Sequence, residues 1–191
     1  MSGTPGSRPV LLLMDFQQGI VERLGDNPAV VGAADRAAKA ARAAGIPVMF
    51  VRVAFRPGYP EVAESNATFA AAAAHAGDAY GQDHPATQVH AALTPEPGEP
   101  VIVKRRVSAF SGSDLDVLLR GAGAGTLILA GISTSGVVLS TLRQAADLDY
   151  RLTVLADACA DTDEEVHRVL TEKVFPRQAV VTTVDEWIES L

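Results

Sequence analysis

TLILAGISTSGVVLSTLRQAA, residues Thr126 to Ala146, is the stretch that decides the fold of this chain. It begins with a short apolar run, 127–130, which Gly131 interrupts. A small polar cluster, 133–135, follows, and from Val137 onward apolar residues recur at helical spacing. The pattern predicts a buried strand, a tight turn and a helix.

The turn between the strand and the helix is a candidate active site. In open α/β sheets, ligands bind just outside the carboxyl ends of the strands. Backbone N–H groups at the start of a helix also suit an anion or a developing oxyanion. We therefore expect residues 133–137 to form part of an active site or its remnant. The alternative is that the hydroxyl groups of Ser133, Thr134 and Ser135 only cap the helix.

Composition limits the class of protein. The 191 residues include 48% apolar and 20% charged residues, which is ordinary for a globular protein with a sizeable core. The net charge of −7 argues against nucleic acid or an anionic membrane as the main partner. Cys159 is the single cysteine, so an intramolecular disulfide is impossible, and a reducing cytoplasmic location is expected.

The sequence predicts one domain that follows a short N-terminal segment. Residues 1–8 are rich in Gly, Ser and Pro and lack the apolar core of a signal peptide, so we expect a flexible tip. No segment approaches the roughly 20 apolar residues of a membrane span. We expect residues 9–191 to form a single domain.

Strands and helices alternate along this domain. Asn27 is expected to cap a first helix, and Thr162 with Glu165 to form a capping box for a later one. The alanine-rich stretch 67–76 is compatible with a helix or with a mobile covering segment. The alternation predicts an α/β fold, a doubly wound parallel sheet with right-handed crossovers. The predicted strands are 10–14, 47–53, 101–103, 127–130, 152–155 and 179–182.

Polar residues follow the strands at one edge of this sheet. Asp15 ends the first strand, Lys104 ends the third, and the turn 133–137 follows the fourth. A carboxylate beside an ammonium group is a plausible acid/base pair, since Lys lowers the carboxylate pKa while burial raises it. A structural ion pair under a loop is the equally plausible alternative.

Three segments resemble the isochorismatase-like family of cysteine hydrolases. They are VLLLMDFQ from Val10, VIVKRRVSAF from Val101, and LILAGISTSGVVLST from Leu127. The resemblance extends from Val10 to about Trp187 and includes the later segment VLADACAD. It implies a six-stranded parallel sheet with helices on both faces, a three-layer α/β/α arrangement.

The resemblance also assigns roles to residues. Asp15 matches the family's catalytic aspartate, a general acid or base, and Lys104 matches the lysine that orients it and stabilises charge. A non-proline cis peptide bond between Ile132 and Ser133 is implied as well. The family's nucleophilic cysteine falls on Val137, which cannot act as a nucleophile.

Amidase chemistry through a thioester is therefore not expected. Cys159, the only thiol, is interpreted as a small buried residue rather than a nucleophile. True isochorismatases also lack the cysteine and hydrolyse a vinyl ether, with the aspartate as acid. The resemblance thus implies a route without cysteine, acting on a vinyl ether or a C–N bond.

Substrate-binding residues are expected on two loops. Arg52 lies near the end of the second strand and Arg56 in the loop after it, and their guanidinium groups suit a substrate carboxylate, although solvated arginines explain them equally well. These two replace the Asp/His cluster of related nicotinamidases, and the histidines show no paired metal spacing, so no metal or other cofactor is expected. The turn residues expected to contact substrate are Ile132, Ser133, Thr134 and Gly136.

The leading hypothesis is a hydrolase of a small, anionic metabolite that uses Asp15 and Lys104 without a cysteine nucleophile. The alternative is a catalytically degenerate member that binds a metabolite or a partner subunit in the same pocket. A roomy pocket that reaches Lys104 and the turn would favour the enzyme. A turn filled by Val137 and its neighbours would favour the non-catalytic binding protein. In a third, weaker option a hydroxyl of residues 133–135 is the nucleophile, with no histidine evidently placed to activate it. A homodimer or larger homo-oligomer is expected.

Overall fold

The computed structural model describes residues 8–25 and 28–191. Most of the expected flexible tip, residues 1–7, lies outside the described residues, as does the expected helix cap Asn27. Arg8, which was assigned to the tip, is the first residue of strand β1, where it pairs with Ala124. The first strand is therefore longer than its apolar run predicts.

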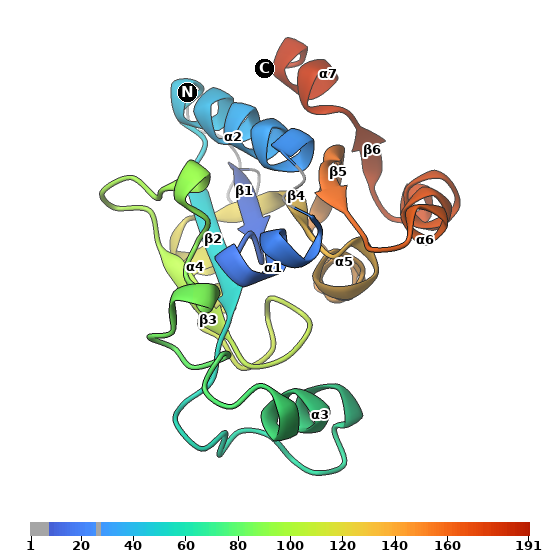
Figure 1. Ribbon diagram of the computed structural model, residues 1–191. Helices are drawn as coiled ribbons and strands as arrows, with labels where there is room; N and C mark the ends of the chain where they lie inside the picture. Colours follow the sequence, from blue (N-terminus) through green and yellow to red (C-terminus); the bar gives the residue numbers. More distant parts are fainter. Residues whose placement is uncertain (1–7, 26–27) are drawn as a thin grey trace.

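Six parallel strands form one sheet in the order β3-β2-β1-β4-β5-β6. The central pair, β1 and β4, has helices in front of it and behind it (Figure 1). This arrangement confirms the predicted parallel, doubly wound fold. The strands are β1 (Arg8–Met14), β2 (Val48–Val53), β3 (Val101–Lys104), β4 (Ala124–Ile132), β5 (Arg151–Ala160) and β6 (Val180–Thr182).

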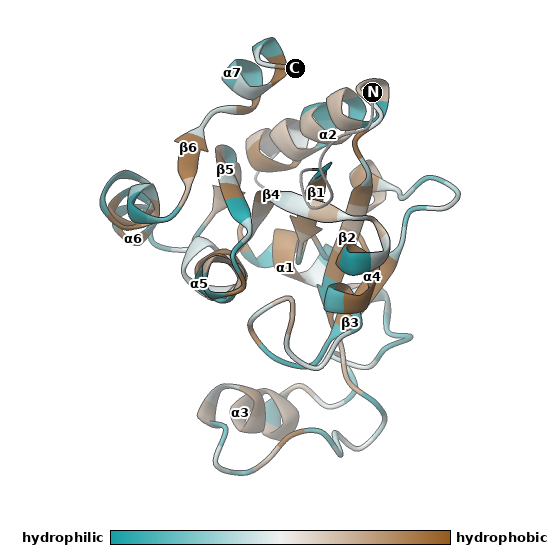
Figure 2. Cartoon of the chain, turned by 180° about the vertical axis from the view of Figure 1, so that it is seen from behind, coloured by the Kyte–Doolittle hydropathy of each residue, from teal (hydrophilic) through white to brown (hydrophobic). Residues whose placement is uncertain are grey.

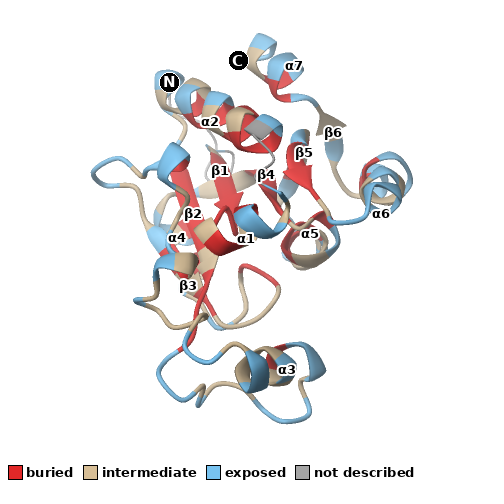
Figure 3. Cartoon of the chain, in the orientation of Figure 1, coloured by how far each residue is buried: buried red, intermediate tan, exposed pale blue. Residues whose placement is uncertain are grey.

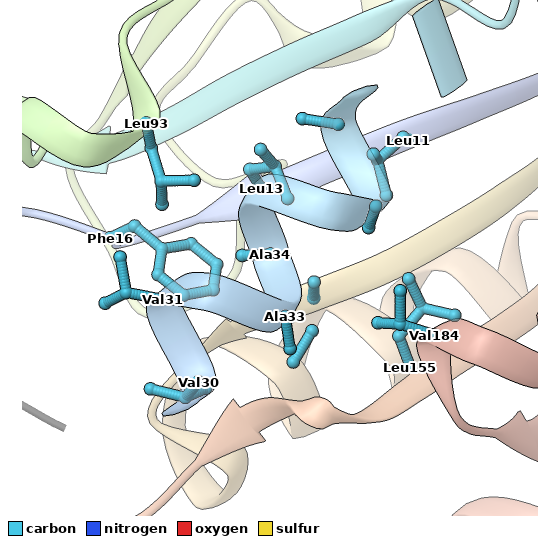
Figure 4. Packing of buried hydrophobic residues seen from close by; sticks show 14 of the residues in the cluster. Leu11, Leu13, Phe16, Val30, Val31, Ala33, Ala34, Leu93, Leu155 and Val184 are labelled. Atoms are coloured by element: carbon cyan, nitrogen blue, oxygen red, sulfur yellow. The ribbon is translucent and has the colours of Figure 1, made fainter. Parts of the chain in front are cut away.

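Side chains of β1 alternate between two hydrophobic layers. Leu11 and Leu13 pack with helix α2 (Pro28–Ala43) and with helix α7 (Val184–Glu189) on one face of the sheet, as Figure 4 shows in part. Leu12 and Met14 pack on the other face with helices α4 (Leu115–Gly121) and α5 (Leu139–Asp147). A strand covered on both faces must be apolar throughout, which explains the continuous run in the sequence.

Strand β5 continues well beyond its predicted end. Its second half pairs with β4 through a register shift, so that Gly131 lies beside Cys159. The sequence suggested that Cys159 lies after this strand, but it lies within the strand. The polar residue Asp157 interrupts the apolar pattern, although the backbone goes on pairing with β4.

The alanine-rich stretch is a helix, α3 (Ala67–His75), which lies at the opposite end of the molecule from α7 (Figure 1). Most of α3 is weakly apolar (Figure 2) and it is largely exposed or half-buried, in contrast to the buried strands (Figure 3). Phe69 is its one buried residue and packs edge-on against Phe55, which anchors the helix to the end of the sheet.

Two local features differ from the sequence-based expectations. A short helix, α1 (Gln18–Arg23), follows β1 and was not predicted. Helix α6 (Glu164–Val169) is capped by Asp163, whose carboxylate accepts from the N–H groups of Glu165 and Val166. The predicted capping box at Thr162 was therefore wrong, since the adjacent carboxylate takes that position.

Candidate active site

Asp15 and Lys104 meet in the interior, at the carboxyl edge of the sheet. Asp15 directly follows β1 and has a φ of 58°, while its N–H donates to the carbonyl of Val51 on β2. Lys104 is the last residue of β3, which β2 separates from β1. The lysine side chain therefore crosses the end of β2, and its Nζ lies 2.9 Å from Oδ2 of Asp15.

Burial controls the electrostatics of this pair. Only 2% of the Lys104 side chain and 7% of the Asp15 side chain is exposed. Burial raises the pKa of Asp15 above its ordinary value, although the charge and hydrogen bond of Lys104 act in the opposite direction. A carboxyl group with a raised pKa keeps its proton closer to neutral pH, which suits a general acid.

The second oxygen of Asp15 takes no part in the ion pair with Lys104. Oδ1 is buried and has no hydrogen-bond partner among the described residues. An unpaired buried acceptor is costly, and such atoms in folded proteins usually indicate a ligand, a water or a catalytic role. Lys104 has a further partner, because its Nζ also donates to the carbonyl of Arg106 at 3.0 Å. The lysine is thus held by two acceptors, whereas Oδ1 of the aspartate is buried without a partner among the described residues.

Gln17 is a site residue that sequence reasoning missed. Its side chain is buried, its Nε2 donates to the carbonyls of Val53 and Thr87, and its Oε1 accepts from the N–H of Val53. These bonds tie the end of β2 to the segment after β1, so that they hold the backbone around Asp15. The signal in the sequence was a glutamine directly after an otherwise apolar segment.

The turn after β4 is a tight, hydrogen-bonded structure. The peptide bond between Ile132 and Ser133 is cis, as the resemblance implied, and a π-helical turn, Thr134–Val138, follows. Gly136 N donates to Oγ of Ser133 at 3.1 Å, and Val138 N donates to the carbonyl of Ser133 at 3.2 Å. Ser133 therefore acts as the cap of this turn.

The carboxylate of Asp161 accepts a hydrogen bond from one backbone N–H group of the turn. Ser135 N donates to Oδ2 of Asp161 at 2.7 Å, and Oδ1 of Asp161 accepts from Thr162 N. Together with the two bonds to Ser133, this contact satisfies three N–H groups of the turn. These three groups are not free for the oxyanion that the sequence suggested they would bind.

Thr134 does have a histidine partner, contrary to expectation. Its Oγ1 lies 2.8 Å from Nδ1 of His167 on helix α6, which packs beside the turn. Burial lowers the pKa of His167, although the charge of Asp161 acts in the opposite direction. Thr134 is fully buried and is not among the described residues that line the adjacent cavity.

A cavity of about 680 Å³ opens directly beside the Asp15–Lys104 pair. It therefore reaches both the lysine and the turn, as expected for an enzyme, while Val137 forms part of its wall. Helices α1 and α3 and the loop after α3 cover it from the side away from the sheet. Of the turn residues expected to contact substrate, Ile132, Ser133 and Gly136 line the cavity. The covering side is formed by residues that include Ile20, Arg23, Leu24, Phe69 and Tyr80.

Two expected substrate-binding residues lie elsewhere. Arg52 donates to the carbonyls of Gln82 and Thr87, and Arg56 pairs with Glu61. Among the described residues, neither arginine lines the cavity at Asp15, because each points to the loops beyond β2.

Cys159 is buried at the pairing of β5 with β4. Burial raises the pKa of its thiol to about 12, which leaves essentially no thiolate near neutral pH. Within residues 8–25 and 28–191, no group of His, Cys, Asp and Glu side chains is arranged to hold a metal ion. In the same ranges no helix is long and apolar enough to cross a membrane.

Comparisons with known proteins agree with this geometry. The isochorismatase domain matches residues 9–186. The chain is 34% identical over 184 residues to the uncharacterized isochorismatase family protein YecD of Escherichia coli O157:H7, covering 95% of each chain. It is 33% identical over 175 residues to the ureidoacrylate amidohydrolase RutB of Pseudomonas syringae, covering 85% of this chain and 68% of the relative.

A solved structure shows the same arrangement over the whole chain. An isochorismatase family protein from Burkholderia thailandensis superimposes with a TM-score of 0.83 at 26% identity, covering 100% of this chain and 97% of the other. The domain match, the identity to relatives and the shared fold lead to the same conclusion. The chain belongs to the isochorismatase family of hydrolases.

Proposed function

We propose that this protein hydrolyses a small anionic metabolite, with Asp15 as the general acid and without a cysteine nucleophile. The observation that carries the proposal is the buried Asp15–Lys104 pair at the cavity, with Oδ1 of Asp15 left without a partner among the described residues. The raised pKa of Asp15 and the size of the cavity support the same role.

The chemistry follows from the state of this carboxyl group. Protonated Asp15 gives its proton to the terminal carbon of a vinyl ether, which forms an oxocarbenium ion. Water adds to that ion and loses a proton, and the resulting hemiketal breaks down to a carbonyl compound and an alcohol. Lys104 holds Asp15 in place and stabilises the carboxylate that proton transfer leaves behind.

Hydrolysis of a C–N bond is the other reaction within this proposal. The Pseudomonas syringae relative is named a ureidoacrylate amidohydrolase, so amide-bearing acids belong among the compounds to test. Asp15 would then protonate the leaving nitrogen, and a water molecule would replace the missing thiol as nucleophile. Val137 leaves no nucleophilic atom at the position that the resemblance assigns to cysteine.

A panel of vinyl-ether acids and small amide acids, followed by mass spectrometry, tests the proposal. Asp15→Asn keeps the shape of the side chain but cannot transfer a proton, so the rate should fall on the order of a hundredfold to ten-thousandfold. Asp116→Asn is the matched control, because Asp116 pairs with Arg120 on the surface of α4. Equal activity of the Asp15→Asn variant and the unaltered protein would contradict the proposal.

A catalytically degenerate binding protein is the second candidate. It is favoured by Val137 in the cavity wall and by the turn N–H groups that Ser133 and Asp161 already occupy. Val137→Cys separates the two: a thiol beside Asp15 could be deprotonated and attack an amide carbonyl. Gain of weak amidase activity would show that the remaining machinery is competent, while binding without turnover in both proteins would favour the binder.

We further propose the setting in which this activity operates. Residues 9–191 act as a single domain, and the protein works in the cytoplasm as a homodimer or larger homo-oligomer. The match of the isochorismatase domain to residues 9–186 supports the first statement, and the exposed alanine-rich helix α3 supports an assembly.

A further inference from the structure

The cavity contains one cation that the Asp15 pair does not use. Among the described residues that line it, Lys104 and Arg23 are the basic ones. Lys104 is buried against Asp15, whereas no carboxylate of the described residues pairs with Arg23. An anionic group that enters the cavity therefore meets one guanidinium whose donors are available.

Arg23 is held over an aromatic ring at the edge of this cavity. It is the last residue of α1, and its guanidinium carbon lies 5.8 Å from the ring centroid of Tyr80. The backbone of Tyr80 is fixed in turn, because its carbonyl accepts from the N–H of Phe55 at 2.8 Å. A cation–π contact uses none of the guanidinium N–H donors, so these groups remain free to bind a carboxylate with two hydrogen bonds.

We propose that Arg23, supported by Tyr80, binds the carboxylate group of the substrate and selects for carboxylic acids. This inference rests on the proposed function of the same site and deepens it. The rest of such a substrate would lie against the apolar wall formed by Ile20, Leu24 and Phe69, with its reacting bond at Oδ1 of Asp15.

Charge elsewhere in the cavity gives the substrate one orientation. Asp15 lies at the inner end, and the carboxylate of Asp161 lines the cavity beside the turn. A substrate carboxylate is repelled by Asp161 and attracted by the guanidinium of Arg23, whereas protonated Asp15 carries no charge. The arginines that the sequence suggested, Arg52 and Arg56, are occupied by backbone carbonyls and by Glu61, so they do not compete for it.

Two probe molecules that differ mainly in charge test the proposal by binding alone. Benzoate and benzamide are titrated into the protein and followed by NMR or calorimetry. Arg23→Met should weaken benzoate binding about tenfold and change benzamide binding less than about twofold, since only benzoate carries a carboxylate. Arg120→Met, a surface variant on α4, is the matched control and should change neither.

Variants of the ring test the role of its partner. Tyr80→Phe should keep benzoate binding because the ring remains, whereas Tyr80→Leu should weaken it about threefold through the loss of the cation–π contact. The proposal is overturned if unaltered protein does not bind benzoate in preference to benzamide. It is also overturned if Arg23→Met, folded by circular dichroism, weakens both probes equally or neither.

The outcome remains separable from that of the proposed hydrolysis. Asp15→Asn should lower turnover on the order of a hundredfold to ten-thousandfold and yet retain the discrimination between benzoate and benzamide, because Arg23 is intact. Suppose that the protein turns over no compound but that Arg23→Met weakens benzoate binding. This result would support the binding role of Arg23 and contradict the proposed hydrolysis. A protein that turns over neutral and acidic substrates equally well would support hydrolysis by Asp15 and contradict the role of Arg23.

Discussion

Burying Asp15 and Lys104 costs desolvation free energy, so we infer that their burial serves the chemistry of the site. Removing two charges from water costs several kcal/mol per ion, and apolar residues of similar volume are often equally stabilising or more so. The pair is nevertheless almost completely enclosed, and it leaves Oδ1 of Asp15 without a partner among the described residues. Such an arrangement is explained more simply by chemistry at Oδ1 than by stability.

The raised pKa of Asp15 predicts how activity and stability depend on pH. The protonated form is the active acid, so kcat/KM should fall as pH rises through the pKa of Asp15. Folding also favours that form, so its stabilising contribution is complete below the ordinary value of 3.8 and is lost as pH rises through the folded pKa. Urea unfolding from pH 3 to 8 measures the second effect, with Asp15→Asn as the reference that lacks it. The unfolding free energy of the unaltered protein minus that of Asp15→Asn should fall as pH rises. A rise of this difference with pH would contradict the raised pKa.

The thiol of Cys159 should be inert in the folded protein. It is buried at the pairing of β4 and β5, and its pKa is raised to about 12, so attack on an alkylating reagent requires unfolding. Iodoacetamide at pH 8 should leave Cys159 unmodified by mass spectrometry and activity intact, and should label it fully in denaturant. If alkylation abolished activity in a protein that stays folded, the proposed site without cysteine would be wrong.

Among the elements, the central strands could be predicted and their ends could not. The apolar run 10–14 indicates a strand covered on both faces, and β1 is such a strand. The second half of β5 escaped prediction because its pairing with β4 shifts register, which no local pattern records. Helix α1 is too short for helical periodicity to show in the sequence.

Glycines allow a direct test of how closely β1 and β4 must approach at the site. A Cβ added to Gly131 would lie 2.7 Å from the carbonyl oxygen of Met14, the residue before Asp15. Gly131→Ala should therefore separate the strands, lower the unfolding free energy by about 1–3 kcal/mol and reduce activity. Gly32→Ala in α2 is the control, because its Cβ meets nothing within 4 Å. Denaturant unfolding should show it to be more stable by about 0.5–1 kcal/mol.

At the scale of the whole molecule, sheet order explains which part of the site could be found in the sequence. Asp15 and Ser133 directly follow strands and Lys104 ends one, so a parallel sheet brings all three to one edge whatever the loops do. Arg23 and Tyr80 come from a short helix and from a loop after α3, whose positions depend on side-chain packing. The sequence therefore predicted that Asp15 and Lys104 lie together, whereas it could not place Arg23 and Tyr80 beside them; Arg52 and Arg56 are not among the described residues that line this cavity.

The exposed face of helix α3 predicts that the protein assembles with copies of itself. Helix α3 exposes alanines along one side, including Ala67, Ala71 and Ala74, and small apolar side chains allow close approach of a second helix. We therefore expect a homodimer or larger symmetric oligomer in which α3 is covered. Light scattering at micromolar concentration should give at least twice the monomer mass, and Ala71→Glu should reduce it. Ala44→Glu, at an exposed position after α2, is the control and should not. A single species of monomer mass in the unaltered protein would refute the prediction.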